Sequence, residues 1–303
     1  MNRFLAKASV LLVSFLISVF VLSFSPLSVP NPCFAKELTI LAAFGTSDKE
    51  AAKSLTAIKT AYEKKGDTVI WAYSSNIIRA KLNKEKQVVY SISEALDYAV
   101  KNGYKDVKIQ SLHVVPAEEY MKICRLISRY MEINSKNFDS VIMGHPLLSS
   151  KEDLDKIIAV VLAALPEERT KEDAVILMGH GNDRGTGDLS LLAAADAFHK
   201  ADPKCWLATV EGALAFENTL AELKQTKVKK VWLRPFMIVA GDHAKNDMAG
   251  EEEDSWKSML MQNGFEVHTV LDGLGSLDGI QAIFMEHTQN SHDNIKDGTI
   301  LSH

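Results

Sequence analysis

Short apolar runs alternate with amphipathic stretches along almost the whole of this chain. The runs Leu38–Phe44 and Ala174–Met178, for example, consist almost entirely of apolar residues. A polar turn and a stretch with helical spacing follow the first run, and this stretch, Lys49–Lys65, ends at Gly66. Strands that alternate with helices form parallel sheets, and strands that are apolar on both faces lie in sheets covered on both sides. The sequence therefore predicts an α/β fold with doubly wound parallel sheets.

The strand–helix pattern begins again in the second half of the chain. Residues 38–45 (LTILAAFG) are similar to residues 174–181 (AVILMGHG). We therefore expect two similar domains of Rossmann-like or flavodoxin-like type, residues 36–168 and residues 169–303, around a cleft. The helix predicted at 149–165 is compatible with either domain. A cleft between two such domains is a natural ligand site.

The first residues of the chain, 1–35, have a different character from the rest. Arg3 and Lys7 precede an uncharged apolar stretch at residues 8–29, and prolines follow. Small residues then occupy the positions that a signal peptidase requires before a cut after Ala35. We predict a signal peptide and an exported, periplasmic protein without a stable membrane span after cleavage. An uncleaved membrane anchor is the alternative, because the apolar stretch is longer than most signal cores.

Charge and composition exclude several classes of protein. The chain is 47% hydrophobic and 24% charged, which is typical of folded soluble proteins rather than disordered or collagen-like ones. The net charge is −5, and removal of the two positive charges of the leader makes it −7. Without a basic excess, a general nucleic-acid binder is not expected. We expect Cys124 and Cys205 to be buried free thiols, with a disulfide as the alternative.

A glycine-rich stretch at residues 179–187 (GHGNDRGTG) has a spacing seen in short-chain dehydrogenases. The strict Gly-x-Gly-x-x-Gly pattern fails, because Arg184 occupies the third glycine position. The Tyr104-x-x-x-Lys108 pair precedes the glycines, whereas the dehydrogenases place such a pair after them. The sequence also contains no Gly-Lys-Ser/Thr phosphate loop. We therefore predict dependence on neither ATP nor NAD.

Three predicted strands of the second half end in a side chain that can bind a metal ion: His180, Glu211 and His243. Neighbouring parallel strands are about 4.8 Å apart and end at the same edge of a sheet, so these side chains are expected to converge. Two imidazoles and a carboxylate suit Co²⁺, Ni²⁺, Fe²⁺ or Zn²⁺. A lone histidine at a strand end is more often a hydrogen-bonded loop residue, so the prediction depends on all three residues together.

Other polar residues carry weaker signals. His113 and His145 lie near the ends of predicted strands in the first half, where they are expected to face the cleft. The acidic run at residues 251–254 is predicted to begin a helix, whose dipole favours negative charge at that end.

Longer motifs surround the three strand-end residues. They are Phe44–Ser47, Gly179–Gly181, Val210–Gly212, Pro235–Asp247 and Gly250–Trp256. Together they closely resemble the sirohydrochlorin cobaltochelatases of the anaerobic pathway, over about residues 37–290. That family belongs to the ATP-independent tetrapyrrole chelatases, which include the protoporphyrin ferrochelatases. The resemblance implies two similar α/β domains around a cleft and the insertion of Co²⁺, with Fe²⁺ as an alternative, into sirohydrochlorin during cobalamin or tetrapyrrole biosynthesis.

The resemblance also implies roles for individual residues. His180 and His243 would hold the metal ion, and Glu211 would complete the catalytic site and accept a pyrrole proton. Sirohydrochlorin carries eight carboxylates, so polar and cationic groups after strand ends are candidates for binding it. These candidates are Thr46, Ser47, Arg79, His113, Arg184 and Lys245.

The sequence is also compatible with a second function. The family normally acts in the cytoplasm, whereas the leader predicts export. An exported metal- or haem-binding transport protein on the chelatase fold is therefore the alternative, with His113 or His145 as an axial haem ligand. The expected partners of the enzyme are sirohydrochlorin and a divalent metal ion, without nucleic acid, and a homo-oligomer is left open.

Overall fold

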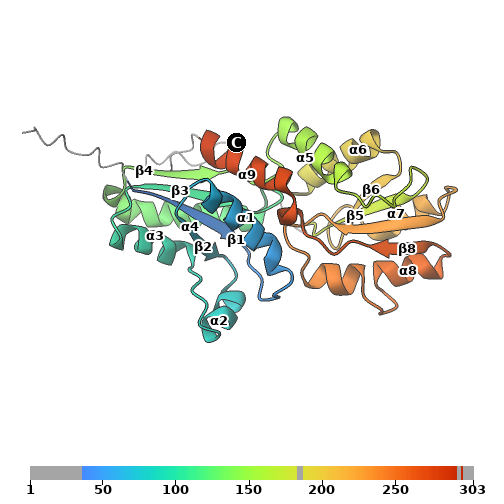
Figure 1. Cartoon of the computed structure of the whole chain (residues 1–303), viewed down its shortest axis with the longest axis horizontal. Coiled ribbons are helices and arrows are strands. Elements are labelled where there is room, and N and C mark those ends of the chain that lie inside the picture. Colours follow the sequence, from blue (N-terminus) through green and yellow to red (C-terminus); the bar gives the residue numbers. More distant parts are fainter. Residues whose placement is uncertain (1–35, 183–186, 292–294, 296–303) are drawn as a thin grey trace, which may run out of the picture. The chain divides into compact units, whose positions relative to one another are not determined.

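The computed structural model describes residues 36–182, 187–291 and 295 (Figure 1). The predicted signal peptide and Arg184 lie outside the described residues. Within the described part of the chain, no helix is both long enough and apolar enough to cross a membrane.

The first half forms a four-stranded parallel sheet in the order β2-β1-β3-β4. The strands are β1 (Glu37–Ala43), β2 (Val69–Tyr73), β3 (Asp106–Ser111) and β4 (Ser140–Gly144). The helices of this half are α1 (Ala52–Lys64), α2 (Asn76–Lys84), α3 (Ile92–Lys101), α4 (Glu118–Asn134) and α5 (Lys151–Ala163). Strand β1 lies inside the sheet, and the later strands are added on both of its sides, as in doubly wound folds.

The second half repeats this topology with the order β6-β5-β7-β8, again all parallel. The strands are β5 (Ala174–Gly179), β6 (Cys205–Thr209), β7 (Lys230–Pro235) and β8 (Glu266–Thr269). The helices are α6 (Gly187–Ala201), α7 (Phe216–Leu223), α8 (Trp256–Gln262) and α9 (Asp278–Asn290). Since β1 and β5 hold the same position in the two sheets, the predicted fold class of two similar doubly wound units is confirmed.

Both sheets are covered on both faces, which explains why their strands are almost continuously apolar. In β1, Leu41 packs in one buried cluster with α1, whereas Ile40 packs in a second cluster with α3 and α4. In β5, Leu177 belongs to the same cluster as Leu41, and Ile176 packs in a third cluster with α7 and α8. One apolar cluster thus extends through both halves. Cys124 and Cys205 are both buried and free, as expected.

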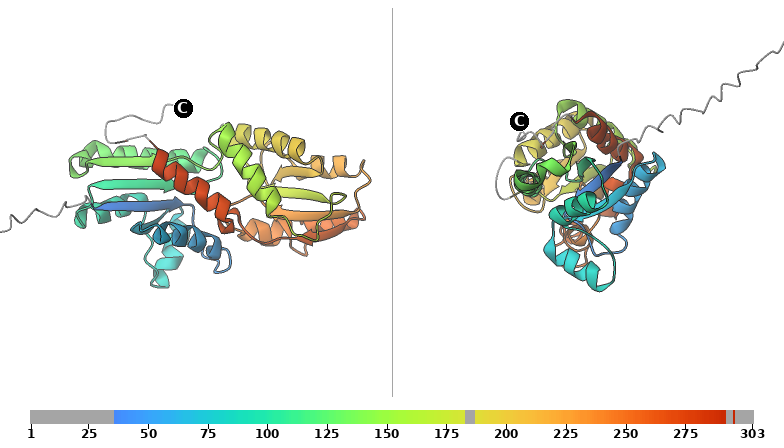
Figure 2. Two further views of the ribbon diagram at one scale, coloured as in Figure 1. Left: turned by 45° about the horizontal axis from the view of Figure 1, so that its top comes forward. Right: turned by 90° about the vertical axis from the view of Figure 1, so that its left-hand side faces the viewer.

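The last helix, α9, returns to the first sheet. It packs on β3, β4, α1 and α5, and Figure 2 shows it crossing beside the first sheet. The hydroxyl groups of Thr288 and Tyr62 lie 2.6 Å apart, and Thr288 also donates to the side-chain oxygen of Gln110 at 2.8 Å. Helix α5 contacts both α6 and α9. The expected domain boundary between residues 168 and 169 stays a prediction.

Two differences from the predicted elements concern residues singled out in the sequence. Strand β7 ends at Pro235, so His243 does not lie directly at a strand end as expected. The carbonyls of the following residues accept hydrogen bonds from Leu274 and Gly275, so this segment leaves the sheet. Helix α8 begins at Trp256 with Ser255 as its cap, and the acidic residues 251–254 precede it as an exposed turn. The prediction that these acids begin a helix is therefore wrong.

Candidate active site

The first two candidate residues lie together because their strands are neighbours. His180 follows β5 and Glu211 comes two residues after β6, and the ends of these strands are paired in register. The backbone N–H of Glu211 donates to the carbonyl of His180 at 3.1 Å. Nδ1 of His180 lies 3.2 Å from Oε1 of Glu211. Parallel pairing of β5 with β6 is thus sufficient to bring this imidazole and this carboxylate into contact.

A glycine makes this close approach sterically allowed. Gly181 has φ of +83°, a left-handed conformation that favours glycine. A Cβ atom at this position would lie 1.7 Å from the carbonyl oxygen of Glu211. The Gly-His-Gly motif therefore allows the two strand ends to approach each other closely.

The third candidate, His243, reaches the same place by a different route. It lies eight residues after the end of β7, immediately before a short π-helical segment, Ala244–Met248. Its ring centroid is nevertheless 4.9 Å from that of His180, with the rings nearly perpendicular at 88°. Nδ1 of His243 lies 2.5 Å from Oδ2 of Asp247. Two imidazoles from separate strand connections are therefore adjacent, each with a carboxylate beside it.

These side chains are accessible to solvent. His180 is 52% exposed, Glu211 45% and His243 40%. Among residues 36–182, 187–291 and 295, no group of three or more His, Cys, Asp or Glu side chains is placed so that it could hold a metal ion. The contacts at this site join residues in pairs: His180 with Glu211, His180 with His243, and His243 with Asp247.

Lys245, a predicted substrate-binding cation, contacts the first half. Its Nζ lies 2.6 Å from Oδ2 of Asp48, which is 197 residues away in sequence. Asp48 also accepts a hydrogen bond from the backbone N–H of Ala51 at 2.9 Å. That hydrogen bond, and after it the ammonium group of Lys245, hold the pKa of Asp48 below its usual value. This ion pair connects the loop after β1 to the segment that carries His243.

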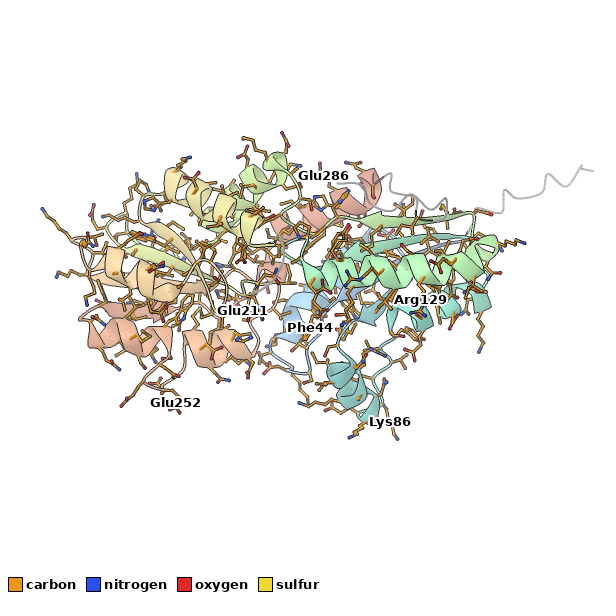
Figure 3. All side chains as sticks on the ribbon, turned by 180° about the vertical axis from the view of Figure 1, so that it is seen from behind. Phe44, Lys86, Arg129, Glu211, Glu252 and Glu286 are labelled. Carbon is orange, nitrogen blue, oxygen red and sulfur yellow. The ribbon has the colours of Figure 1, made fainter. Side chains whose placement is uncertain are left out.

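The loop after β1 contains further candidates. Thr46 accepts a hydrogen bond from the backbone N–H of Asp48 at 3.1 Å, and Ser47 is partly buried. Phe44 immediately precedes them and is 50% exposed, which is unusual for a large aromatic side chain. Figure 3 labels Phe44 and Glu211, which come from the ends of β1 and β6 in the two halves. The first half thus presents both apolar and hydrogen-bonding groups at the end of its central strand.

The structure places two other candidates within the first half. Arg79 on α2 donates to Asn76 at 2.5 Å and to Glu94 at 3.3 Å. His113 contacts Ser111 through Nδ1 at 2.9 Å, and its buried Nε2 has no hydrogen-bond partner among the described residues. Burial lowers the pKa of His113 to about 4, so this imidazole is neutral near pH 7.

Sequence reasoning missed two acidic residues. Asp48 and Asp247 pair with Lys245 and His243, respectively. The spacing of His243 and Asp247, four residues apart in a helical stretch, was a signal that could have found the second pair. No comparable signal exists for the first, because that pair forms only in the folded chain.

Comparison with known structures defines the class of fold. The sirohydrochlorin chelatase SirB from Bacillus subtilis subspecies spizizenii, solved in complex with cobalt, superposes with a TM-score of 0.58 at 12% identity. The alignment covers 88% of this chain and 98% of SirB. At this identity the likeness establishes a two-domain α/β chelatase fold.

Sequence comparison then defines the family. The family model described as Cobalt chelatase (CbiK) matches residues 37–293. The sirohydrochlorin cobaltochelatase CbiKC of Nitratidesulfovibrio vulgaris is 33% identical over 254 residues, which cover 83% of this chain and 89% of that protein. The sirohydrochlorin cobaltochelatase of Salmonella typhimurium is 33% identical over 218 residues, which cover 71% and 80%. This chain belongs to the cobalt chelatase family.

Proposed function

We propose that this protein is a sirohydrochlorin cobaltochelatase, which inserts Co²⁺ into sirohydrochlorin without consuming ATP. The observation that carries the proposal is the pair of imidazoles, His180 and His243, 4.9 Å apart in a chain of this family. The names of two relatives at 33% identity support the same substrate and metal. They do not favour the alternative of an exported transport protein.

The two imidazoles explain how the metal ion is bound. Neutral imidazole nitrogen is a good ligand for Co²⁺, and two such ligands leave coordination positions for the pyrrole nitrogens of the substrate. The rings are about half exposed, so a hydrated ion and a large macrocycle can both reach them. The metal ion is a substrate in this reaction, so it has to be released to the macrocycle after binding.

Insertion of a divalent ion also displaces two pyrrole N–H protons. Glu211 lies next to His180 and offers a carboxylate as a proton acceptor at one face of the macrocycle. His180, Glu211 and His243 are therefore our proposed catalytic and metal-binding residues. The proposed chemistry requires no phosphoryl donor and no nicotinamide.

The carboxylates of the substrate require cationic and hydrogen-bonding partners on an acidic protein. Lys245 is the strongest candidate for this role, since it lies two residues after His243 and is 35% exposed. A substrate carboxylate would replace Asp48 on its ammonium group. Thr46, Ser47, Arg79 and His113 are the other described candidates, and Arg184 is a candidate from sequence alone.

The physiological metal and the location are finer parts of the proposal. We infer Co²⁺ rather than Fe²⁺, Ni²⁺ or Zn²⁺ from the family, and rates of insertion with each ion separate the four. We also infer that residues 1–35 direct export and are removed after Ala35. Cell fractionation and N-terminal sequencing test this inference, and a cytoplasmic protein that retains Met1 would contradict it.

The decisive experiment is a metallation assay. Purified protein without residues 1–35 is mixed with sirohydrochlorin and Co²⁺, and the absorbance change on insertion is followed. A rate no higher than the spontaneous reaction overturns the enzyme proposal. We expect His180→Ala and His243→Ala each to lose most of the activity, and full activity in both variants refutes the site.

His268→Ala is the matched control for these variants. This histidine is 39% exposed and lies 2.7 Å from the carboxylate of Glu266, so it is similar in exposure and partner to His243. His268 lies within strand β8, whereas the candidate residues follow β5, β6 and β7. We therefore expect the substitution to leave metallation unchanged. The haem alternative has its own test: a Soret band in the isolated protein that disappears in His113→Ala or in His145→Ala would support it.

A further inference from the structure

Both site histidines direct the same ring nitrogen toward hydrogen-bond acceptors. Nδ1 of His243 lies 2.5 Å from Oδ2 of Asp247. Nδ1 of His180 lies 3.1 Å from the carbonyl oxygen of Gly181 and 3.2 Å from Oε1 of Glu211. Carbonyl and ionised carboxylate oxygens can only accept, so Nδ1 carries the hydrogen in both rings. In the neutral imidazole the lone pair is then on Nε2, which is the atom left to bind a metal ion.

We propose that Asp247 is a positioning residue of the metal site, which holds His243 as the Nδ1–H tautomer and directs its Nε2 toward the incoming divalent cation. A carboxylate behind a ligating imidazole fixes the ring orientation and increases the basicity of the ligating nitrogen. The proposal deepens the chelatase function and rests on it, because the cation is the substrate of that reaction.

The local fold explains how this pair is held together. His243 immediately precedes the π-helical segment, and Asp247 follows four residues later on the same side. Ala244 and Met248, which lie one residue after each member of the pair, are both fully buried. These two buried residues anchor the segment, so the imidazole and the carboxylate are held facing each other at its surface. Glu211 also lies beside Nδ1 of its histidine, His180, but it follows a neighbouring strand and is 3.2 Å away.

If Asp247 had a purely structural role, its loss would change the stability of the fold and not the affinity for the metal ion. The side chains of His243 and Asp247 are 40% and 46% exposed, and exposed ion pairs contribute little to stability. Loss of the carboxylate should therefore hardly change the unfolding midpoint. Loss of a carboxylate partner from a metal-bound histidine typically weakens metal binding by about 10–100-fold. Metal affinity and stability thus respond differently if Asp247 acts through His243.

The experiment measures Co²⁺ binding to metal-free protein, without sirohydrochlorin, by isothermal titration. We expect Asp247→Ala to weaken binding about 10–100-fold. Asp247→Asn should weaken it less, because the amide oxygen still accepts the hydrogen bond from Nδ1 but carries no charge. Asp242→Asn is the matched control. It removes one negative charge from the same exposed segment, where the carboxylate of Asp242 accepts a hydrogen bond from the side chain of Asn246, and it should leave the affinity unchanged.

The tautomer is measured separately by nitrogen-15 NMR of histidine-labelled protein without metal. We expect the His243 signal, assigned from its loss in His243→Gln, to show hydrogen on Nδ1 in the wild type and a mixture of tautomers in Asp247→Ala. Unchanged Co²⁺ affinity in a folded Asp247→Ala protein overturns the proposal, as does hydrogen on Nε2 in the wild type. If Asp247→Ala does not fold, the affinity of Asp247→Asn decides instead.

These outcomes are distinguishable from failure of the chelatase function. A protein that binds Co²⁺ in an Asp247-dependent way but does not metallate sirohydrochlorin refutes the proposed reaction and keeps the positioning role. In the metallation assay, Asp247→Ala should raise the KM for Co²⁺ and leave the KM for sirohydrochlorin unchanged. An active enzyme in which both constants match the wild type refutes the positioning role alone.

Discussion

Substitution of Asp48 by Asn should improve binding of sirohydrochlorin. Asp48 neutralises Lys245 through a contact of 2.6 Å, and its negative charge repels the carboxylates of an approaching substrate. The substitution frees the ammonium group for the substrate and removes the repulsion. Asn is chosen because its side-chain oxygen can still accept the hydrogen bond from the backbone N–H of Ala51.

The size of the effect follows from Coulomb's law. A substrate carboxylate about 6 Å from Asp48 is repelled by about 0.7 kcal/mol in water and by about 2.8 kcal/mol at an effective dielectric constant of about 20. The side chain of Asp48 is 40% exposed, so the lower figure is the better guide. The KM for sirohydrochlorin should therefore fall about threefold, since about 1.4 kcal/mol corresponds to a factor of ten. The stability should change by no more than about 1 kcal/mol, as for other exposed pairs.

The assay is steady-state metallation at about 0.05 and about 0.5 M ionic strength. The effect should be largest at low salt, because the screening length shortens from more than 10 Å to only a few ångströms as salt rises. Asp155→Asn is the control, since it breaks an exposed pair with Lys151 elsewhere on the chain and changes the net charge by the same amount. An unchanged or higher KM in Asp48→Asn, or an equal fall in Asp155→Asn, refutes the reasoning.

Three further predictions concern stability and reactivity. Burial is the largest single influence on Asp153 and acts to raise its pKa. The hydrogen bonds to His287 and Ser150, together with electrostatic interactions with His287 and Lys156, outweigh burial, so the pKa lies below the usual value. The carboxylate therefore stabilises the fold above its unfolded pKa of about 4, and this contribution is lost as pH falls through the folded value. Urea unfolding should show Asp153→Asn about 1–3 kcal/mol less stable than the wild type at pH 7, with a smaller difference near pH 3; a constant difference would contradict this. Gly181→Ala should abolish most of the activity and destabilise more than Gly66→Ala, because both have positive φ but only the first would place a Cβ against backbone, 1.7 Å from a carbonyl oxygen. Burial raises the pKa of Cys205 to about 12, so a charged maleimide should label this thiol only after unfolding, and fast labelling of the native protein would be inconsistent with its burial.

The sequence was sufficient to predict part of the site because parallel sheets have a simple geometry. The apolar runs before His180 and Glu211 identify two strands, and parallel strands end at the same edge. Consecutive strands in this topology are often neighbours, so the contact between the two side chains needs no further information. For the same reason, the similarity of residues 38–45 to residues 174–181 was sufficient to predict that β5 repeats β1.

The remaining part of the site depends on contacts between distant segments. His243 was expected at a strand end, but β7 stops at Pro235 and the chain reaches His180 through a segment held by Leu274 and Gly275. Hydrophobic periodicity cannot distinguish such an apolar segment from a strand. The ion pair between Lys245 and Asp48 joins residues 197 positions apart, and only the tertiary fold specifies it.

The return of α9 to the first sheet has a consequence for the order in which the protein can fold during synthesis. The hydroxyl of Tyr62 finds its partner on Thr288, 226 residues later. Ser291 completes the same cover by donating to the carbonyl of Met143. A ribosome that has made the whole first sheet still has to deliver almost the entire remaining chain before the polar groups beneath α9 are satisfied. Nascent chains and C-terminal truncations should therefore expose this face to proteases and chaperones until the last helix emerges.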